Sequence, residues 1–326
     1  MHHAADGSFR NPWPESEPHG LLDVLRWARA RRGTALPPTP PRGFFPVTAP
    51  GYAQPRLDDA DASATWVGHS TIMLQMGGRN VLTDPMWSER AFPVQWAGPR
   101  RVMPPSVALE ALPPLDIVLL SHSHYDHLDK NTVKWIARRH HEAIWVTPLR
   151  LGAYLRGFGV KRIVELDWWE SADVHGIRIA ATPARHFSAR RVGDRNRTLW
   201  CGFTLEGSGR RCYFAGDSAY HPEFSEIGAR YGPFDLVAMP IGAYDPRWFM
   251  QRVHVNPEEA VRACVDLAST HRGARPALTL GIHWGTFRLT DEPMDEPPRR
   301  TRVAWTAAGL PDDRLWIPAF GETRAW

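Results

Sequence analysis

The sequence predicts an α/β protein in which sheets are covered by helices. Short apolar runs rich in β-branched residues recur from about residue 64 to the C-terminal region, and such runs are typical of strands. Helical stretches separate several of them, and strands mixed with helices bury their apolar faces against one another. With 326 residues, 43% of them hydrophobic, the chain is long enough to build a large core.

Residues 1–60 are expected to form a proline-rich leader rather than a domain. They hold one short helical candidate, "GLLDVLRWARARRG". Its apolar face would carry Leu21, Leu22, Leu25 and Ala28, with arginines mostly elsewhere. Such a helix could rest on anionic lipid or dock on the protein's own surface, and the sequence leaves both interpretations open.

Residues 61–326 are expected to form one folded domain. The expected strands lie in the runs "ATWVGHSTIMLQM", "NVLTDP", "DIVLLSHSH", "AIWVTP", "RIVELDWWE", "IRIAATPARH", "LWCGFTL", "RCYFAGD", "FDLVAMPIG" and "ALTLGIHWG", most of which end in polar residues. The expected helices are "KNTVKWIARRHH", "HPEFSEIGARY" and "NPEEAVRACVDLAS", the last beginning at an Asn256 cap with Pro257 in its first turn. Asp129 is expected to cap the first of these helices.

Composition narrows the class of protein. The formal net charge is +4 and all but three of the 39 basic residues are arginine, which suits phosphate groups or simply reflects a GC-rich genome. This charge alone does not indicate a nucleic-acid partner. The cysteines Cys201, Cys212 and Cys264 form no regular framework, so a reducing, cytoplasmic setting is expected. The N-terminus lacks the apolar segment of a secretory signal, and no apolar run reaches membrane-spanning length. Peripheral contact with a membrane and the oligomeric state, a homodimer included, stay open.

Several expected strands end in histidine or aspartate. The stretch "SHSHYDHLD" follows an apolar run, and three further runs end in ligand-type residues; the full set is His122, His124, Asp126, His127, His186, Asp217 and His283. Strand ends at one edge of a sheet share a cleft, so these side chains should converge. Seven ligands are too many for one tetrahedral ion and suit two.

The spacing suggests how two ions would share these ligands. We expect His122, His124 and His186 on one ion and Asp126, His127 and His283 on the other, with Asp217 bridging. His122 and His124 would leave an extended segment on one face. Histidine-rich ligation fits two Zn²⁺ ions best.

These motifs resemble the metallo-β-lactamase superfamily, whose fold is an αββα sandwich with two metals between the sheet edges. Further stretches, including "TWVGHST", "ELDWWE", "PIGAYDPRWFM", "HVNPEEAV" and "IHWGTF", are similar to the N-acylphosphatidylethanolamine-hydrolysing phospholipase D branch. The leader's "FRNPWP" is similar to that branch as well. The likeness covers roughly residues 9–324.

The resemblance implies a phosphodiesterase of phospholipase D type. Two divalent ions, two ligand carboxylates and a metal-bridging hydroxide leave about one positive charge, which suits an anionic N-acylphosphatidylethanolamine or a related amphiphilic diester. Asp217, His254 and Asp126 are the expected catalytic residues, although metals beside Asp217 would make it a poor acid. In the resembling family the position of His254 lies near the metals, so we expect phosphate contact or protonation of the leaving group.

Four further residues are expected around the ligands. Asp84 should orient a ligand histidine, and His69 is an open candidate for lining the cleft. His221 departs from the resembling family and could add a ligand or acid near Asp217. An apolar substrate groove could be lined by Trp248, which lies within 246–253, and by the stretch 86–101, although tryptophan also fills cores.

Two other functions stay open at this stage. One is a lactonase resembling the ascorbate-phosphate lactonases on the same dinuclear site. The other is a non-enzymatic DNA- or envelope-associated protein with a vestigial site, which the complete ligand set argues against.

Overall fold

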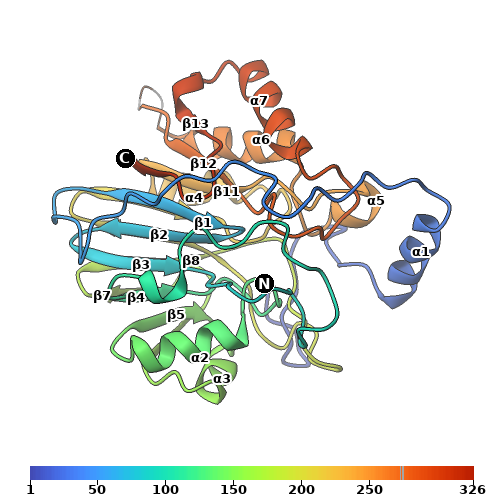
Figure 1. Ribbon diagram of the computed structural model, residues 1–326, viewed down its shortest axis with the longest axis horizontal. Helices are drawn as coiled ribbons and strands as arrows, with labels where there is room; N and C mark the ends of the chain where they lie inside the picture. Colours follow the sequence, from blue (N-terminus) through green and yellow to red (C-terminus); the bar gives the residue numbers. More distant parts are fainter. Residues whose placement is uncertain (272, 274) are drawn as a thin grey trace.

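Two facing seven-stranded sheets form the centre of the protein (Figure 1). The computed structural model describes residues 1–271, 273 and 275–326. In spatial order the first sheet contains β14 (Thr323–Ala325), β1 (Ser63–Gly68), β2 (Thr71–Met76), β3 (Arg79–Thr83), β4 (Ile117–Leu119), β5 (Ile144–Pro148) and β6 (Ile163–Leu166). The second contains β13 (Leu315–Trp316), β12 (Leu278–Ile282), β11 (Leu236–Pro240), β10 (Arg210–Phe214), β9 (Gly202–Gly207), β8 (Ile177–Thr182) and β7 (Ser171–Val174).

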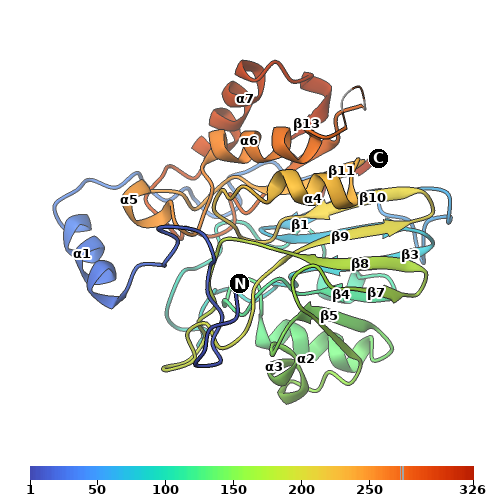
Figure 2. The same cartoon turned by 180° about the vertical axis from the view of Figure 1, so that it is seen from behind.

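Helices cover the outer face of each sheet. α2 and α3 lie on the first sheet, and α4, α6 and α7 lie on the side of the second (Figures 1 and 2). The described helices are α1 (Leu21–Arg31), α2 (Lys130–Arg139), α3 (Gly152–Gly157), α4 (Phe224–Tyr231), α5 (Arg247–Met250), α6 (Pro257–Ala268) and α7 (Glu296–Ala307), with short 3₁₀ turns at Leu109–Ala111 and Asp312–Arg314. This arrangement confirms the predicted αββα sandwich.

Alternation along the strands explains why both faces of the first sheet are buried. In β2, Ile72 and Leu74 join the core between the sheets, whereas Met73 joins the core beneath α2 and α3. In β4, Ile117 and Val118 divide between the two cores in the same way. Because side chains alternate across a strand, a continuous apolar run supplies two faces at once.

Helix signals in the sequence are confirmed at α2 and α6. The Asp129 carboxylate accepts a hydrogen bond from the Asn131 amide at the start of α2. Asn256 and Glu259 form a reciprocal capping box at α6, with Pro257 at its first position. The sequence interpretation missed α7, whose Pro297 falls in the first turn, where no backbone N–H partner is needed.

The leader packs on the domain rather than standing apart from it. Phe9 and Phe45 are buried in the core that both sheets share. α1 lies beside α5 at one end of the sandwich (Figures 1 and 2), where the Trp27 indole donates to Asp291 at 2.5 Å. The helix is therefore docked, yet Leu22 on its apolar side is 81% exposed. The division at residue 60 stays a prediction.

None of the described helices is long and apolar enough to cross a bilayer.

We predict that Gly228→Ala destabilises the protein. A Cβ at Gly228 in α4 would lie 2.0 Å from the Leu267 carbonyl oxygen of α6, so the two helices would have to separate. Overpacking of this kind costs about 1–3 kcal/mol, more than the roughly 1 kcal/mol that alanine gains over glycine in a helix. The measurement is the free energy of unfolding in urea.

Gly157→Ala is the matched control. Gly157 ends α3 and a Cβ there meets nothing within 4 Å. We expect this variant to be as stable as the wild type or slightly more stable. Equal unfolding free energies for the two variants would contradict the close α4–α6 contact.

Candidate metal centre

The predicted ligand residues lie on four loops that meet between the two sheets. His122, His124, Asp126 and His127 follow β4, His186 follows β8, Asp217 follows β10 and His283 follows β12. The sequence placed the strand before His122 too far along, because β4 ends at Leu119. Beyond it, the Ser121 amide donates to the Asp84 carboxylate at 2.7 Å instead of continuing a sheet ladder.

Three imidazoles form the first group. His124 Nδ1 lies 2.9 Å from His122 Nε2 and 3.1 Å from His186 Nε2. The Nδ1–H of His186 donates to the Val253 carbonyl at 2.8 Å, which leaves its Nε2 lone pair facing the group. Burial and the neighbouring imidazoles lower the pKa of His124 to about 3, so the ring is neutral, as a metal ligand must be.

A second group lies next to the first and contains one residue more than predicted. Atoms of Asp126, His127, His283 and also His69 lie within 4.8 Å of one another. Asp126 Oδ2 is 3.4 Å from Nε2 of both His127 and His283. His69 Nε2 is 3.0 Å from the same oxygen, so His69 contacts a predicted ligand directly.

Asp217 lies between the two groups. Its Oδ2 is 3.1 Å from His127 Nε2 and 3.2 Å from His283 Nε2 on one side. On the other side it is 3.8 Å from the Nε2 atoms of His122 and His186. A carboxylate in this position can contact ligands of both groups, as the sequence prediction of a bridging residue requires.

The surroundings shift the pKa values of Asp217 and His127 in opposite directions. Burial opposes ionisation of Asp217, but the imidazoles of His127, His283 and His254 outweigh it and keep the pKa of the carboxyl well below its usual range. Burial also opposes a charge on His127, yet the carboxylates raise its pKa well above the usual range. Positive charge is therefore stabilised at this position.

Several buried polar atoms in the centre have no hydrogen-bond partner among the described residues. They are Nε2 of His127, Oδ1 of Asp217, both ring nitrogens of His283, and Nδ1 of His69 and of His254. Buried polar groups are normally paired, so a cluster of unpaired ones needs an explanation. Convergent imidazole lone pairs and carboxylate oxygens are the donor set of a borderline divalent cation, and the residues fit such an ion.

Asp84 lies behind the centre and contacts a predicted ligand histidine. Its carboxylate accepts the Nδ1–H of His127 at 2.7 Å, the Ser121 hydroxyl at 2.6 Å and the Ser121 amide at 2.7 Å. The residue is fully buried. Accepting the Nδ1 proton fixes the tautomer of His127 and turns its Nε2 toward Asp217.

The remaining predicted residues lie in different surroundings. His254 Nε2 is 3.8 Å from Asp217 Oδ2, at the edge of the centre. Trp248 lines a cavity of about 480 Å³ between α1 and α5, together with Trp27. His221 packs between Trp13 and Phe224 instead, and the carboxylate within reach of its Nδ1 is Glu223 at 3.4 Å. Its predicted role beside Asp217 has no contact to support it.

The sequence interpretation missed the leader's contribution to the centre. The Asn11 side-chain amide is buried and donates to the His186 carbonyl at 2.8 Å. Outside the leader, Arg190 was also not predicted: it donates to the carbonyls of Ser123 and Leu128, which stabilises the loop that carries His124. Asn11 belongs to the "FRNPWP" stretch, in which no local pattern points to the site and only the resemblance marks it.

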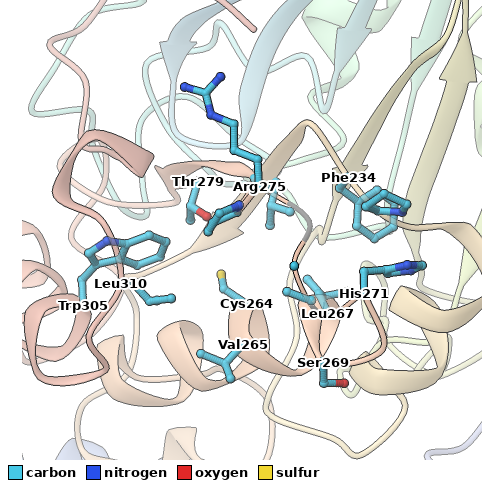
Figure 3. Close-up of a pocket in the computed structure, with 16 residues that line it drawn as sticks. Phe234, Cys264, Val265, Leu267, Ser269, His271, Arg275, Thr279, Trp305 and Leu310 are labelled. Carbon is cyan, nitrogen blue, oxygen red and sulfur yellow. The ribbon is translucent and has the colours of Figure 1, made fainter.

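A second cavity lies away from this centre. It measures about 310 Å³ and is lined by apolar residues of α6, the β11–β12 region and α7, including Val265, Leu267 and Trp305 (Figure 3). The Cys264 thiol faces it, and burial raises the pKa of that thiol to about 12. None of the predicted ligands lines this cavity, so it is not the reaction cleft.

Comparison with known proteins decides the family. A family model described as "Beta-lactamase superfamily domain" matches residues 79–284, and this range holds all the predicted ligands. The chain belongs to the metallo-β-lactamase superfamily. It is a metal-dependent hydrolase of that superfamily, which excludes the non-enzymatic alternative.

Relatives of this hydrolase include both uncharacterised proteins and named enzymes. An uncharacterised protein of Mycobacterium tuberculosis is 43% identical over 304 residues, which are 92% of this chain and 78% of that protein. The N-acyl-phosphatidylethanolamine-hydrolyzing phospholipase D 1 of Caenorhabditis elegans is 42% identical over 245 residues, 72% of this chain and 67% of that enzyme. The crystal structure of an isothiocyanate hydrolase from Delia radicum gut bacteria matches with a TM-score of 0.63 and 21% identity, covering 81% of this chain and 98% of that one; it shares the fold.

We predict that Asp84→Asn weakens metal binding without unfolding the protein. An amide in place of the carboxylate still fills the space, but it removes the charged acceptor of the His127 Nδ1 proton. Loss of such outer partners typically costs about 10–100-fold in metal affinity. The measurement is metal affinity by chelator competition.

Asp129→Asn is the control for this variant. Asp129 is also buried and accepts hydrogen bonds from the Ser88 amide and hydroxyl, but it caps α2 instead of contacting a ligand histidine. We expect lower stability with unchanged metal affinity. Equal metal affinities for Asp84→Asn and the wild type would refute the orienting role of Asp84.

Proposed function

We propose that this metal-dependent hydrolase is a phosphodiesterase of phospholipase D type. Its substrate would be N-acylphosphatidylethanolamine or a related amphiphilic phosphodiester, and the products would be phosphatidic acid and an N-acylethanolamine. The observation that carries the proposal is the pair of ligand groups joined at Asp217. The C. elegans relative, named for this substrate, supports the choice of substrate class.

In this proposal two Zn²⁺ ions share seven ligands. His122, His124 and His186 would hold one ion, Asp126, His127 and His283 the other, and Asp217 both. Bound divalent metal supplies Lewis acidity, which lowers the pKa of water and stabilises charge on phosphoryl oxygens. His69 is close enough to Asp126 to orient that carboxylate, at 3.0 Å.

The chain's own residues bind and orient the diester. Two carboxylates, Asp126 and Asp217, offset part of the metal charge and leave the centre suited to an anion. In the reaction the oxygen of water bonds to phosphorus, the bond from phosphorus to the ethanolamine oxygen breaks, and that oxygen takes up a proton. Asp217 stays ionised in its imidazole surroundings, so it positions groups rather than donating this proton.

His254 is best placed to contact the phosphate. Burial lowers its pKa well below the usual range, and a nearby divalent cation would lower it further. The ring is therefore neutral and has no additional proton to give as a general acid. A neutral imidazole still donates one N–H. From a position 3.8 Å from Asp217, that N–H can stabilise negative charge on a phosphoryl oxygen.

The cavity between α1 and α5 offers a place for the apolar part of the substrate. Trp27 and Trp248 line it, and Arg247, which also lines it, donates to the His254 carbonyl at 3.0 Å. The cavity therefore adjoins the segment that carries His254. Aromatic walls with arginine at the edge suit an amphiphile with an acyl chain and a phosphate.

An activity screen tests the substrate class. The purified protein is expected to hydrolyse bis(p-nitrophenyl) phosphate and N-acylphosphatidylethanolamine in vesicles, and to lose both activities after chelation and regain them with Zn²⁺. A panel of lactones distinguishes the phosphodiesterase from the alternative lactonase. Opening of lactones with both diesters left intact would reject the phosphodiesterase and favour the lactonase.

Substitutions test the assigned roles. Asp217→Asn is expected to abolish turnover, because the residue links the two ligand groups. His254→Ala is expected to lower kcat by about 10²–10³-fold, the usual cost of removing one donor to developing charge, with metal content unchanged. Metal content is measured by mass spectrometry of the digested protein. Loss of metal from His254→Ala would show that His254 is a ligand instead.

A further inference from the structure

A second cluster of metal-ligating side chains lies outside the catalytic centre. It joins the first residues of the leader to the segment after β6. His2 Nε2 is 2.6 Å from Asp167 Oδ1, and His3 Nε2 is 2.7 Å from Asp167 Oδ2. The three ligand atoms lie within 4.8 Å of one another.

The surrounding structure holds these groups in place. The Trp168 amide donates to Asp167 Oδ1 at 2.8 Å, which fixes the carboxylate. The His2 ring stacks on the Trp168 ring with centroids 4.2 Å apart, and His3 pairs with Phe9 through a backbone bridge. Both histidines therefore point their Nε2 atoms at one carboxylate without any rearrangement of the chain.

The charge of Asp167 lacks a permanent counterion in the described part of the chain. The cationic groups found within 4.0 Å of it are the two imidazoles, and no arginine or lysine side chain is among them. Burial, partly offset by Asp167, lowers the pKa of His2. A neutral imidazole leaves the carboxylate uncompensated, and it is also the form of histidine that binds metal.

We propose that His2, His3 and Asp167 form a second divalent-metal site that takes Zn²⁺ or a similar borderline ion. Two imidazole nitrogens and one carboxylate oxygen are a zinc donor set, and water completes a tetrahedral shell at this partly exposed position. Without metal, two N–H groups hydrogen-bond the carboxylate. With metal, each neutral ring moves its proton from Nε2 to Nδ1 by exchange with solvent, and both Nε2 lone pairs bind the ion together with Asp167.

A metal at this site would bind the first residues of the leader to the segment after β6. Further along the leader, the Phe9 amide donates to the Asn196 carbonyl at 2.8 Å, and Asn11 reaches the backbone of His186. Metal bound by His2 and His3 favours the docked leader by mass action, because the undocked leader separates the two histidines from Asp167. The proposal does not depend on which substrate the hydrolase cleaves.

Metal stoichiometry on the full chain tests the proposal. The protein is equilibrated with Zn²⁺ and its content is measured by mass spectrometry. The wild type is expected to hold one more Zn²⁺ per chain than the double variant His2→Ala/His3→Ala, and Asp167→Asn is expected to show the same loss. His141→Ala is the matched control, because His141 is exposed and lies beside a single carboxylate, Glu142, at 3.4 Å; it should keep the wild-type content.

Hydrogen exchange gives a second measurement. Added Zn²⁺ is expected to slow amide exchange in residues 4–11 of the wild type and of Asp217→Asn, but not in the double variant. Equal Zn²⁺ content in the wild type and the folded double variant would overturn the proposal. The absence of any zinc-dependent protection of residues 4–11 in the wild type would overturn it as well, whether or not the double variant folds.

Discussion

The arrangement around Asp217 is the constraint on which the rest of the structure depends. Asp217 is 4% exposed, and its carboxylate has imidazole nitrogens of five histidines within 3.8 Å, contributed by four separate segments of the chain. Burying a charge is costly unless it is paired. The two sheets bring these segments together at one edge, and positive charge between them would stabilise the buried carboxylate.

Backbone hydrogen bonds that cross between the sheets keep this edge rigid. The His283 amide, after β12, donates to the His69 carbonyl at the β1–β2 turn, and the Cys201 amide, before β9, donates to the Ser121 carbonyl after β4. Each bond joins a loop of one sheet to a loop of the other. Ligands on such cross-linked loops are positioned by the sandwich itself, which a preorganised centre requires.

The leader belongs to the same physical unit. It supplies Phe9 and Phe45 to the core between the sheets, Asn11 to the His186 loop and Trp27 to one wall of a cavity. α1 is docked through Trp27 yet leaves Leu22 and Leu25 exposed. Docking and an amphipathic outer face coexist, so the two interpretations that the sequence left open do not exclude each other.

The sequence by itself determined most of the strands and helices, sheets covered by helices, and the six predicted ligands that meet around Asp217, while the αββα class came from the resemblance of its motifs to a known superfamily. Local periodicity, caps such as Asn256 and polar residues at strand ends carry that information. Only the tertiary structure decided that His69 joins the centre, that His221 packs between Trp13 and Phe224, and that the leader reaches His186. Those contacts join residues far apart in the chain through backbone groups and ring stacking, and no local pattern of residues records such pairings.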